Sequence, residues 1–599
     1  MSLLQAYSSL SSSSQRATIS HTLQSIAGAP PIDSPSCKAL IQLILDDLQA
    51  AIIDDSSSRL TRADALSALS AVKGLGRIPH GAQVLATVPN LKRLITLAVK
   101  LEAAPDASNE ALKCVANTLL LSEPARTRLL SQDIDGGNIC VDLLQKSTTP
   151  ENTFLSSRIL FLCTASPQQS ASFIESIVET NRTHFPGNGT IIDVIALKLD
   201  DLIASMQAGV KMSRDAMTDL LKLTFNLLVH YPKLAPSEVQ SPALACSPHD
   251  QKVMGDFWNS RLDGILPTLV RAFQTIPLSS PNPLTSPLTH IIHSLITIPV
   301  DVSSRAIWFG TRPHSHSSTP QPSSPESATP PLASSSHDNQ PTPKEPKARH
   351  IERAISSVIS AGRRSLCRSS RSTSPSTADC ASRAYELLDT TLSHFLPGDI
   401  DPDDPAVRDL CKIDGDTSLD EIVCPLVILI TRFCLGDDDA KTRIRQWLVP
   451  ENLDRTHPLE KRGDLLGRCL RLLASVYHSR LKDSTGEMLY AMCDSNATTL
   501  AGYFGYGNVA GFLFHKGVVS APPVSAASGA PPTTASGLPI NPITGTVEHP
   551  SENNIDMTDE EKEHEAEKLF VLFDRLEKTG ALPPSQNPYR KAFQEGKMG

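Results

Sequence analysis

The sequence lacks the short motifs that mark many enzymes and membrane proteins. It has no Gly-x-x-x-x-Gly-Lys-Ser/Thr segment to hold phosphate groups and no Gly-x-Ser-x-Gly turn to present a nucleophile. Its longest apolar stretch, from Cys424 to Arg432, is too short to cross a bilayer and ends on a charge. We therefore predict a protein without covalent catalytic chemistry, without a cofactor and without an integral membrane segment.

Positive charge is also scarce. The formal net charge is −9, so the chain as a whole lacks the basic field by which proteins attract nucleic acid. The 12 cysteines contain no Cys-x-x-Cys pair, and several lie inside apolar helical runs, which favours buried, reduced thiols. Residues 1–20 contain Ser runs in place of the basic start and apolar core of a secretory signal. These observations predict a cytoplasmic protein that binds no nucleic acid.

What the sequence does contain, almost without interruption, is helical periodicity. From residue 34 to about residue 278, apolar residues recur at spacings of three and four, and no alternating strand pattern is found. The segments are too short and too many for a coiled coil, so they must pack on one another. Representative predicted helices cover residues 63–75, 91–101, 110–121, 155–163, 191–206 and 216–230.

Two of these helices resemble each other in sequence. Glu110-Ala-Leu-Lys-Cys-Val-Ala-Asn117 and Asp219-Leu-Leu-Lys-Leu-Thr-Phe-Asn226 each carry an acid, then Leu-Lys, then Asn at the same spacing. A helix that is apolar on most sides and carries one Asn is typical of the inner helix of an armadillo or HEAT repeat, whose flanks are covered by neighbouring repeats. We predict an all-α, armadillo/HEAT-like superhelix, although two unrelated amphipathic helices would look similar.

Changes of composition divide the chain. Tracts rich in Pro and Ser cannot bury enough apolar surface to fold, so they separate the helical parts. The predicted parts are an N-terminal segment with a flexible start (1–33), repeats (34–309), a disordered Ser/Pro insert (310–348), further repeats (349–519) with a mobile Arg/Ser loop (363–376), a linker (520–556), an amphipathic helix (557–579) and a flexible tail (580–599).

The last predicted helix has a well-defined start. Thr558 and Glu561 form a capping box, in which each side chain accepts a hydrogen bond from a backbone N–H that has no partner in the helix. Because the helix is tethered by a linker, its apolar stripe must dock either on the repeats of its own chain or on a partner, and the sequence leaves both open. The stripe consists of Ala566, Leu569, Phe570, Phe573 and Leu576.

Two patterns match binding motifs only in part. His290-Ile-Ile-His293 would place two imidazoles on one helical face, but it has no Cys or carboxylate partner at metal-ligand spacing. Gly505-Tyr-Gly507-Asn-Val-Ala-Gly511 differs by one position from a dinucleotide fingerprint, and no strand precedes it. We predict no metal at the first pattern and interpret the second as a turn between helices.

Five fragments are spread along the chain in one order. They are segment 110–117, the helix 157–163, segment 220–228, the turn 505–511, and Asn541-Pro-Ile-Thr-Gly545 followed by residues 557–575. In this order they resemble the synembryn family of cytosolic exchange factors and chaperones for the α subunits (Gα) of heterotrimeric G proteins. The Ser/Pro insert departs from the family pattern, and the linker lacks the acidic, phosphorylatable run of animal members. The chain is therefore identified as a fungal-type member.

The resemblance implies a function performed by binding. In the family, a right-handed superhelix of armadillo-like repeats receives the C-terminal helix of Gα in a concave groove, and C-terminal segments brace Gα near its switch region. Withdrawal of the Gα helix loosens the loops that hold GDP, so GDP leaves, the nucleotide-free Gα is held, and GTP binding ejects the factor. The same grip on an incompletely folded Gα would serve as chaperoning.

The implied partner is Gα in its GDP-bound and nucleotide-free states. A monomer in the cytoplasm is expected, with recruitment to the cell cortex or plasma membrane through Gα as a further expectation. The alternative function is that of a generic armadillo-type scaffold or adaptor, which would bind peptide tails without any effect on nucleotide. Both functions use a groove, and the residues alone do not separate them.

Five residues of the predicted repeats are candidates for contacts with Gα. Lys73 and Arg77 lie four positions apart, on one face if a single helix includes both, and could pair with carboxylates of a Gα tail; a solvated face is the alternative. Asn117 and Asn226 would offer amides to the guest backbone or bond within the repeats. Arg158 would add a contact to Gα or pair with an acid of a neighbouring repeat. The candidates in the C-terminal helix are Leu569, Phe570 and Phe573.

Overall fold

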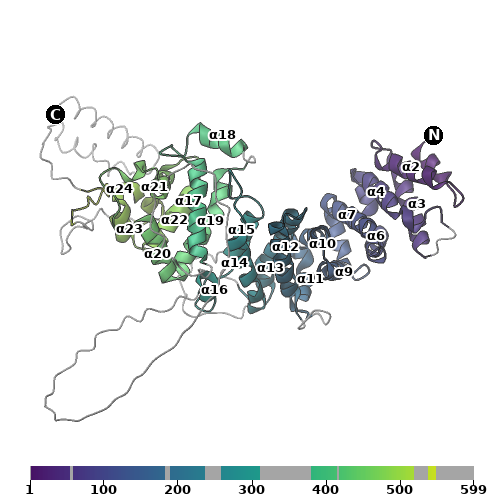
Figure 1. Ribbon diagram of the computed structural model, residues 1–599, viewed down its shortest axis with the longest axis horizontal. Coiled ribbons are helices and arrows are strands. Elements are labelled where there is room, and N and C mark those ends of the chain that lie inside the picture. Colours follow the sequence, from purple (N-terminus) through teal and green to yellow (C-terminus); the bar gives the residue numbers. More distant parts are fainter. Residues whose placement is uncertain are drawn as a thin grey trace, which may run out of the picture.

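The chain folds into an elongated stack of helices (Figure 1). The computed structural model describes residues 2–53, 58–181, 189–235, 258–310, 379–413, 417–518 and 537–547. Across these ranges the regular secondary structure is helical, and the β-type pairing is limited to an isolated antiparallel bridge between Ile540 and Val547. The N-terminal helices lie at one end of the long axis, and α23 and α24 lie at the other (Figure 1). The predicted all-α repeat fold is confirmed.

One row of helices runs through the whole stack. Each member packs on the previous and on the next member, so we call this set the central row. Its members are α4 (Ala65–Leu75), α7 (Pro105–Leu121), α10 (Pro150–Thr164), α13 (Ser213–Leu234), α15 (Leu288–Ile296), α19 (Leu419–Gly436) and α22 (Ser479–Met492).

The other helices pack against the central row or against one another. They are α1 (Leu3–Ser8), α2 (Arg16–Ala27), α3 (Ser34–Ile53), α5 (Pro79–Leu85), α6 (Val88–Lys100), α8 (Glu123–Leu129), α9 (Gly136–Lys146), α11 (Pro167–Glu179), α12 (Ile191–Gln207), α14 (Leu266–Thr275), α16 (Arg305–Phe309), α17 (Cys380–Phe395), α18 (Pro405–Ile413), α20 (Asp438–Leu448), α21 (Leu465–Ala474), α23 (Ala497–Phe504) and α24 (Tyr506–His515). Short 3-10 helices cover Arg62–Asp64, Ser260–Ile265 and Leu459–Lys461.

Proline and capping residues set many helix boundaries. Pro stands in the first or second position of α5, α6, α7, α10 and α11, where its missing N–H removes no helical hydrogen bond. Thr190 and Asp193 form a capping box at the start of α12. The helices predicted at 110–121 and 216–230 lie inside α7 and α13. Their polar first turns show little apolar periodicity, so the sequence placed both starts too late.

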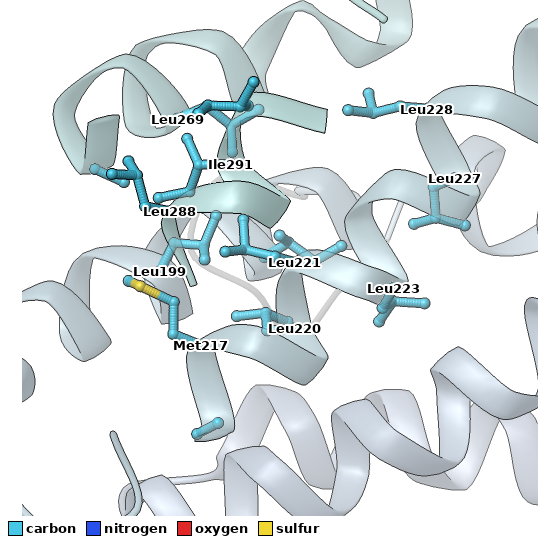
Figure 2. Close-up of a cluster of buried hydrophobic side chains, with 14 of the residues drawn as sticks. Leu199, Met217, Leu220, Leu221, Leu223, Leu227, Leu228, Leu269, Leu288 and Ile291 are labelled. Atoms are coloured by element: carbon cyan, nitrogen blue, oxygen red, sulfur yellow. The ribbon is translucent and has the colours of Figure 1, made fainter. Parts of the chain in front are cut away.

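The hydrophobic core continues from one repeat to the next. Figure 2 shows side chains from α12, α13, α14 and α15 that point toward one another. Leu199, Met217, Leu221, Leu269 and Ile291 in this cluster are all fully buried. Because each helix of the central row contributes to the cores on both of its flanks, the stack is stabilised mainly by contacts between neighbouring repeats.

The predicted insert and tail lie outside the described residues. Before the insert, α16 ends at Phe309, and the next helix, α17, begins at Cys380. Most of the Ser/Pro insert at 310–348, the Arg/Ser loop at 363–376 and everything after Val547 fall outside the described ranges. Of the predicted linker at 520–556, only residues 537–547 are described.

Replacing Leu221 by Ala should lower the free energy of unfolding by about 2–5 kcal/mol, because truncating a buried Leu leaves a cavity. The matched control is Leu197→Ala on α12, a side chain that is 49% exposed and should cost less than about 1 kcal/mol. Urea unfolding followed by circular dichroism measures both changes through the transition midpoint. Equal midpoints for the two variants would contradict the packing around α13.

Candidate protein-binding face

Each helix of the central row leaves one stripe of side chains partly uncovered. The stripes follow helical spacing, and the remaining sides of each helix are buried against neighbours. Contacts between the stripes of successive helices join them into one surface, which we call the row face. From α4 to α13 it includes Ser70, Lys73, Lys113, Asn117, Phe154, Arg158, Phe161, Lys222 and Phe225.

Glu110 on α7 joins the first two helices of the row. Its side chain is 6% exposed and forms ion pairs with Lys73 of α4 and Lys113 of its own helix, and Ser70 donates a hydrogen bond of 3.0 Å to it. Lys113 also pairs with Glu151 of α10, at 2.9 Å between Nζ and Oε1. Burial acts to raise the pKa of the Glu110 carboxyl, but the hydrogen bond and charge of Lys73 outweigh it, so the pKa is lowered. Glu110 is therefore an anion at neutral pH and holds Lys73 in place.

The same arrangement recurs around Asp219 on α13. Its side chain is 2% exposed and pairs with Arg158 of α10, at 2.7 Å between Nε and Oδ2. Lys222 of the same helix lies 3.1 Å from Oδ1. The two related sequence segments thus encode the same device: a buried carboxylate that receives one cation from the preceding helix of the row and one from its own helix.

Aromatic rings lie beneath two of these cations. The guanidinium carbon of Arg158 is 4.6 Å from the centre of the Phe154 ring, and Nζ of Lys222 is 5.5 Å from that of Phe161. At these distances a cation is attracted to a ring face.

The next helix of the central row, α15, carries His290. Burial and then the charge of Lys222 lower the pKa of His290 to about 4, so this imidazole is neutral at physiological pH. Between α4 and α15, the positive charges of the row face therefore end at α13.

Three of the predicted site residues are engaged within the chain. Lys73 and Arg158 form the ion pairs with Glu110 and Asp219. Asn226 donates hydrogen bonds from Nδ2 to the carbonyl of Phe161 at 3.2 Å and to the hydroxyl of Thr164 at 3.0 Å. For Arg158 and Asn226, these are the intramolecular contacts that the sequence left as an alternative. For Lys73 the stated alternative was a solvated face, and the ion pair with Glu110 was not predicted.

Arg77 and Asn117 are placed differently. Helix α4 ends at Leu75, so the condition for Lys73 and Arg77 to share one helical face is not met. Arg77 is exposed, and among the described residues no carboxylate lies within ion-pair distance of it. Asn117 is half-buried on α7, and its side chain forms no hydrogen bond with any of the described residues. Toward the described residues, these two side chains leave their hydrogen-bonding groups unused.

Sequence reasoning assigned no role to Glu110, Asp219, Phe154 or Phe161. The available signal was the acid that precedes Lys by three positions in both related segments. That pattern does not show which cation of another helix meets the acid. The other predicted candidates, Leu569, Phe570 and Phe573, lie outside the described residues.

The row face offers chemistry for binding. Cations over aromatic rings suit the carboxylates and apolar side chains of a helical peptide. Within the described ranges, no three His, Cys, Asp or Glu side chains are grouped so that they could hold a metal ion. No helix in those ranges combines the length and apolar character needed to cross a membrane.

Replacing Glu110 by Gln should lower the free energy of unfolding by about 1–3 kcal/mol at pH 7, since Lys73 and Lys113 lose a buried anion. The folded-state pKa of Glu110 is depressed, so its contribution is complete above the unfolded pKa of about 4.3 and is lost as pH falls through the folded pKa. The deficit of the variant should therefore shrink in acid. Urea unfolding at pH 7 and near pH 3 measures it. Glu151→Gln, at a side chain that is 40% exposed, is the control and should show a smaller deficit. A deficit of Glu110→Gln that is the same at both pH values would contradict the assignment of Glu110 as a buried anion.

Known proteins similar to this chain form a consistent group. The profile of the family described as guanine nucleotide exchange factor synembryn matches residues 68–597. "Chaperone Ric-8A" of Mus musculus is 32% identical over 174 residues, which cover 28% of this chain and 32% of that protein. "Chaperone Ric-8A" of Xenopus laevis is 28% identical over 180 residues, or 29% of this chain and 33% of that protein.

Coverage differs among these relatives. The alignments with the two vertebrate proteins span about a third of the length of each relative, at 32% and 33%. "Chaperone Ric-8" of Drosophila pseudoobscura pseudoobscura is 23% identical over 499 residues, which cover 81% of this chain and 72% of that protein. Among solved structures, an engineered protein aligns with 82% of this chain and 77% of its own at 12% identity, and its TM-score of 0.39 is too low to support a conclusion.

Proposed function

This chain belongs to the synembryn family of guanine nucleotide exchange factors, and we propose that it is an exchange factor and folding chaperone for G-protein α subunits. It acts by binding, without covalent chemistry. The observation that carries the proposal is the row face, where cations held by buried acids lie over aromatic rings on successive repeats. The family match over residues 68–597 supports the identity of the partner.

The row face suits the C-terminal helix of Gα. A helix in a groove makes contacts at spacings of three and four residues, and Phe154, Phe161 and Phe225 offer apolar rings between the cations. The C-terminal end of a helix carries partial negative charge in addition to the terminal carboxylate of the chain. In this proposal Arg77 pairs with a guest carboxylate, and the free amide of Asn117 bonds to the guest backbone.

Exchange follows from where the guest helix is held. Drawing the Gα helix into the row face removes it from beside the guanine pocket, so the loops around GDP loosen and GDP leaves. The factor binds the nucleotide-free state better than the GTP-bound state, so GTP binding ejects it. A factor present at 100 times its dissociation constant stabilises the state it binds by about 2.7 kcal/mol. The same contact therefore serves as chaperoning for an unstable Gα.

The rest of the chain completes the proposal. The repeats at 34–309 and 349–519 form one binding body, and Leu569, Phe570 and Phe573 contact Gα near its switch region. The protein acts as a monomer in the cytoplasm and reaches the cell cortex or plasma membrane through Gα.

Mixing the purified chain with a GDP-loaded Gα subunit should speed GDP release, because a withdrawn Gα helix no longer supports the guanine pocket. Release of a fluorescent GDP analogue in the presence of excess GTP measures the rate. A release rate equal to that of Gα alone, together with binding of the Gα tail peptide, would leave the generic peptide-binding scaffold as the function.

Replacing Arg77 by Glu should weaken binding of a Gα C-terminal peptide roughly tenfold, a loss of about 1.4 kcal/mol, because an exposed cation facing the guest carboxylates is reversed. Lys92→Glu on α6 makes the same charge change at an exposed site away from the row face and should leave affinity unchanged. Fluorescence anisotropy with a labelled peptide measures both.

Replacing both Lys73 and Arg77 by Glu would be a weaker test of this contact than replacing Arg77 alone. A Glu at position 73 would lie beside the buried Glu110, so lost binding could reflect a disturbed repeat. Equal peptide affinity for Arg77→Glu and Lys92→Glu would place the guest carboxylates elsewhere.

A further inference from the structure

Two sequence fragments that are far apart in the chain are joined in the structure. The backbone N–H groups of Tyr506 and Gly507, the first two residues of α24, donate hydrogen bonds of 2.8 Å to the carbonyls of Pro542 and Ile543. The first N–H groups of a helix have no acceptor within the helix. Residues 537–547 therefore supply the acceptors that the start of α24 needs.

Arg455 ties the same segment to the preceding helix. It is 7% exposed, and its guanidinium donates hydrogen bonds to the carbonyl of Gly545 at 2.7 Å and to that of Tyr503 at 2.9 Å. Tyr503 lies in the last turn of α23, where the helix dipole favours a cation. In return, the N–H of Val547 donates to the Arg455 carbonyl at 2.9 Å. Residues 542–547 are thus bound to the repeats at four points through backbone groups of this segment.

Glycines allow the close approach. Gly505 has φ +81°, and a Cβ there would lie 2.6 Å from the nitrogen of Gly545 and from the carbonyl carbon of Thr544. Gly545 has φ +72°, and a Cβ there would lie 3.0 Å from backbone atoms of Gly505 and Phe504. Within the segment, Asn541 accepts two backbone hydrogen bonds through Oδ1 and closes a turn with Gly545. This preformed turn and its close contact indicate a specific docking site.

We propose that residues 540–547 are a clasp that anchors the C-terminal part of the chain beside α24, so that this part reaches Gα from the end of the superhelix opposite Arg77. The inference rests on the proposed function and adds positioning residues to it: Arg455, Gly505 and Gly545. Figure 1 places α23 and α24 at the far end of the stack from α4. A guest held at the row face is then contacted from the other end of the stack by the C-terminal part of the chain, which starts at the clasp.

The benefit of the clasp is a shorter tether. The sequence predicts a linker at 520–556 before the amphipathic helix at 557–579. With the clasp formed, about nine linker residues remain before that helix, whereas without it roughly 37 do, and the effective concentration of a tethered segment falls about as the −3/2 power of linker length. Opening the clasp should therefore slow GDP release by roughly five- to tenfold.

Two pairs of full-length variants test the clasp. Gly505→Ala and Gly545→Ala place a Cβ against the docked backbone. Gly517→Ala and Gly537→Ala are the matched controls, since these glycines also have positive φ, at +72° and +77°, but have no other residue within 4 Å of the added Cβ. Gly505 lies at the junction of α23 and α24, so Gly505→Ala can also disturb these helices. Gly545→Ala changes only the docked segment and leaves α23 and α24 intact, so it tests the clasp alone.

Three measurements are made on each variant: amide hydrogen exchange, affinity for a Gα C-terminal peptide, and GDP release from Gα. We expect Gly545→Ala to speed exchange at the amides of Asn541, Gly545 and Val547, to leave peptide affinity unchanged and to slow GDP release five- to tenfold. Gly537→Ala should match the parent chain in all three.

Two results would overturn the clasp. One is a parent chain whose amides at 541–547 exchange as fast as an unfolded peptide. The other is a Gly545→Ala variant in which these amides exchange fast while the rate of GDP release stays within twofold of that of Gly537→Ala. A parent chain that protects these amides but does not speed GDP release would overturn the proposed function and leave the docking itself standing.

Discussion

Helices of the central row are buried against neighbours on every side but one, so none of them is stable by itself. Each depends on the repeat before it and the repeat after it, as the shared core of α12, α13, α14 and α15 shows (Figure 2). This dependence has a direct consequence for function. The one side left open on each helix lines up with the open side of the next, so stacking by itself produces a long continuous face.

The positive charges of the row face are held in position by buried acids. Glu110 and Asp219 are buried, and each receives cations from two sides, one of them on the preceding helix of the row. Buried ion pairs add little net stability, yet removing one partner is costly. They therefore favour the one alignment of successive helices in which every buried acid has its cations. The outward result is a set of positive groups held at fixed positions over aromatic rings.

The two ends of the molecule have complementary parts in the proposed function. The row face holds a guest near α4 to α13, and the clasp at α23 and α24 sets where the C-terminal part of the chain begins. The stack is elongated (Figure 1), and in the proposed function the second contact with Gα starts from a fixed point at the far end of the stack. The close contact of Gly505 with Gly545 provides that point.

The fold could be predicted from the sequence because it depends on local patterns. Apolar spacing of three and four and proline at helix starts are legible in short windows, and the helices at 110–121 and 216–230 were located by them. The candidate site was less accessible. Lys73 and Arg158 were found as cations, but whether they face a guest or a buried acid depends on a helix that lies tens of residues away. The sequence by itself determined the helices, their repetition and the family. Only the tertiary structure decided which charges are already neutralised, that Arg77 lies beyond the end of α4, and that Asn541 to Gly545 docks at Gly505, because each of these depends on contacts between segments that no local pattern connects.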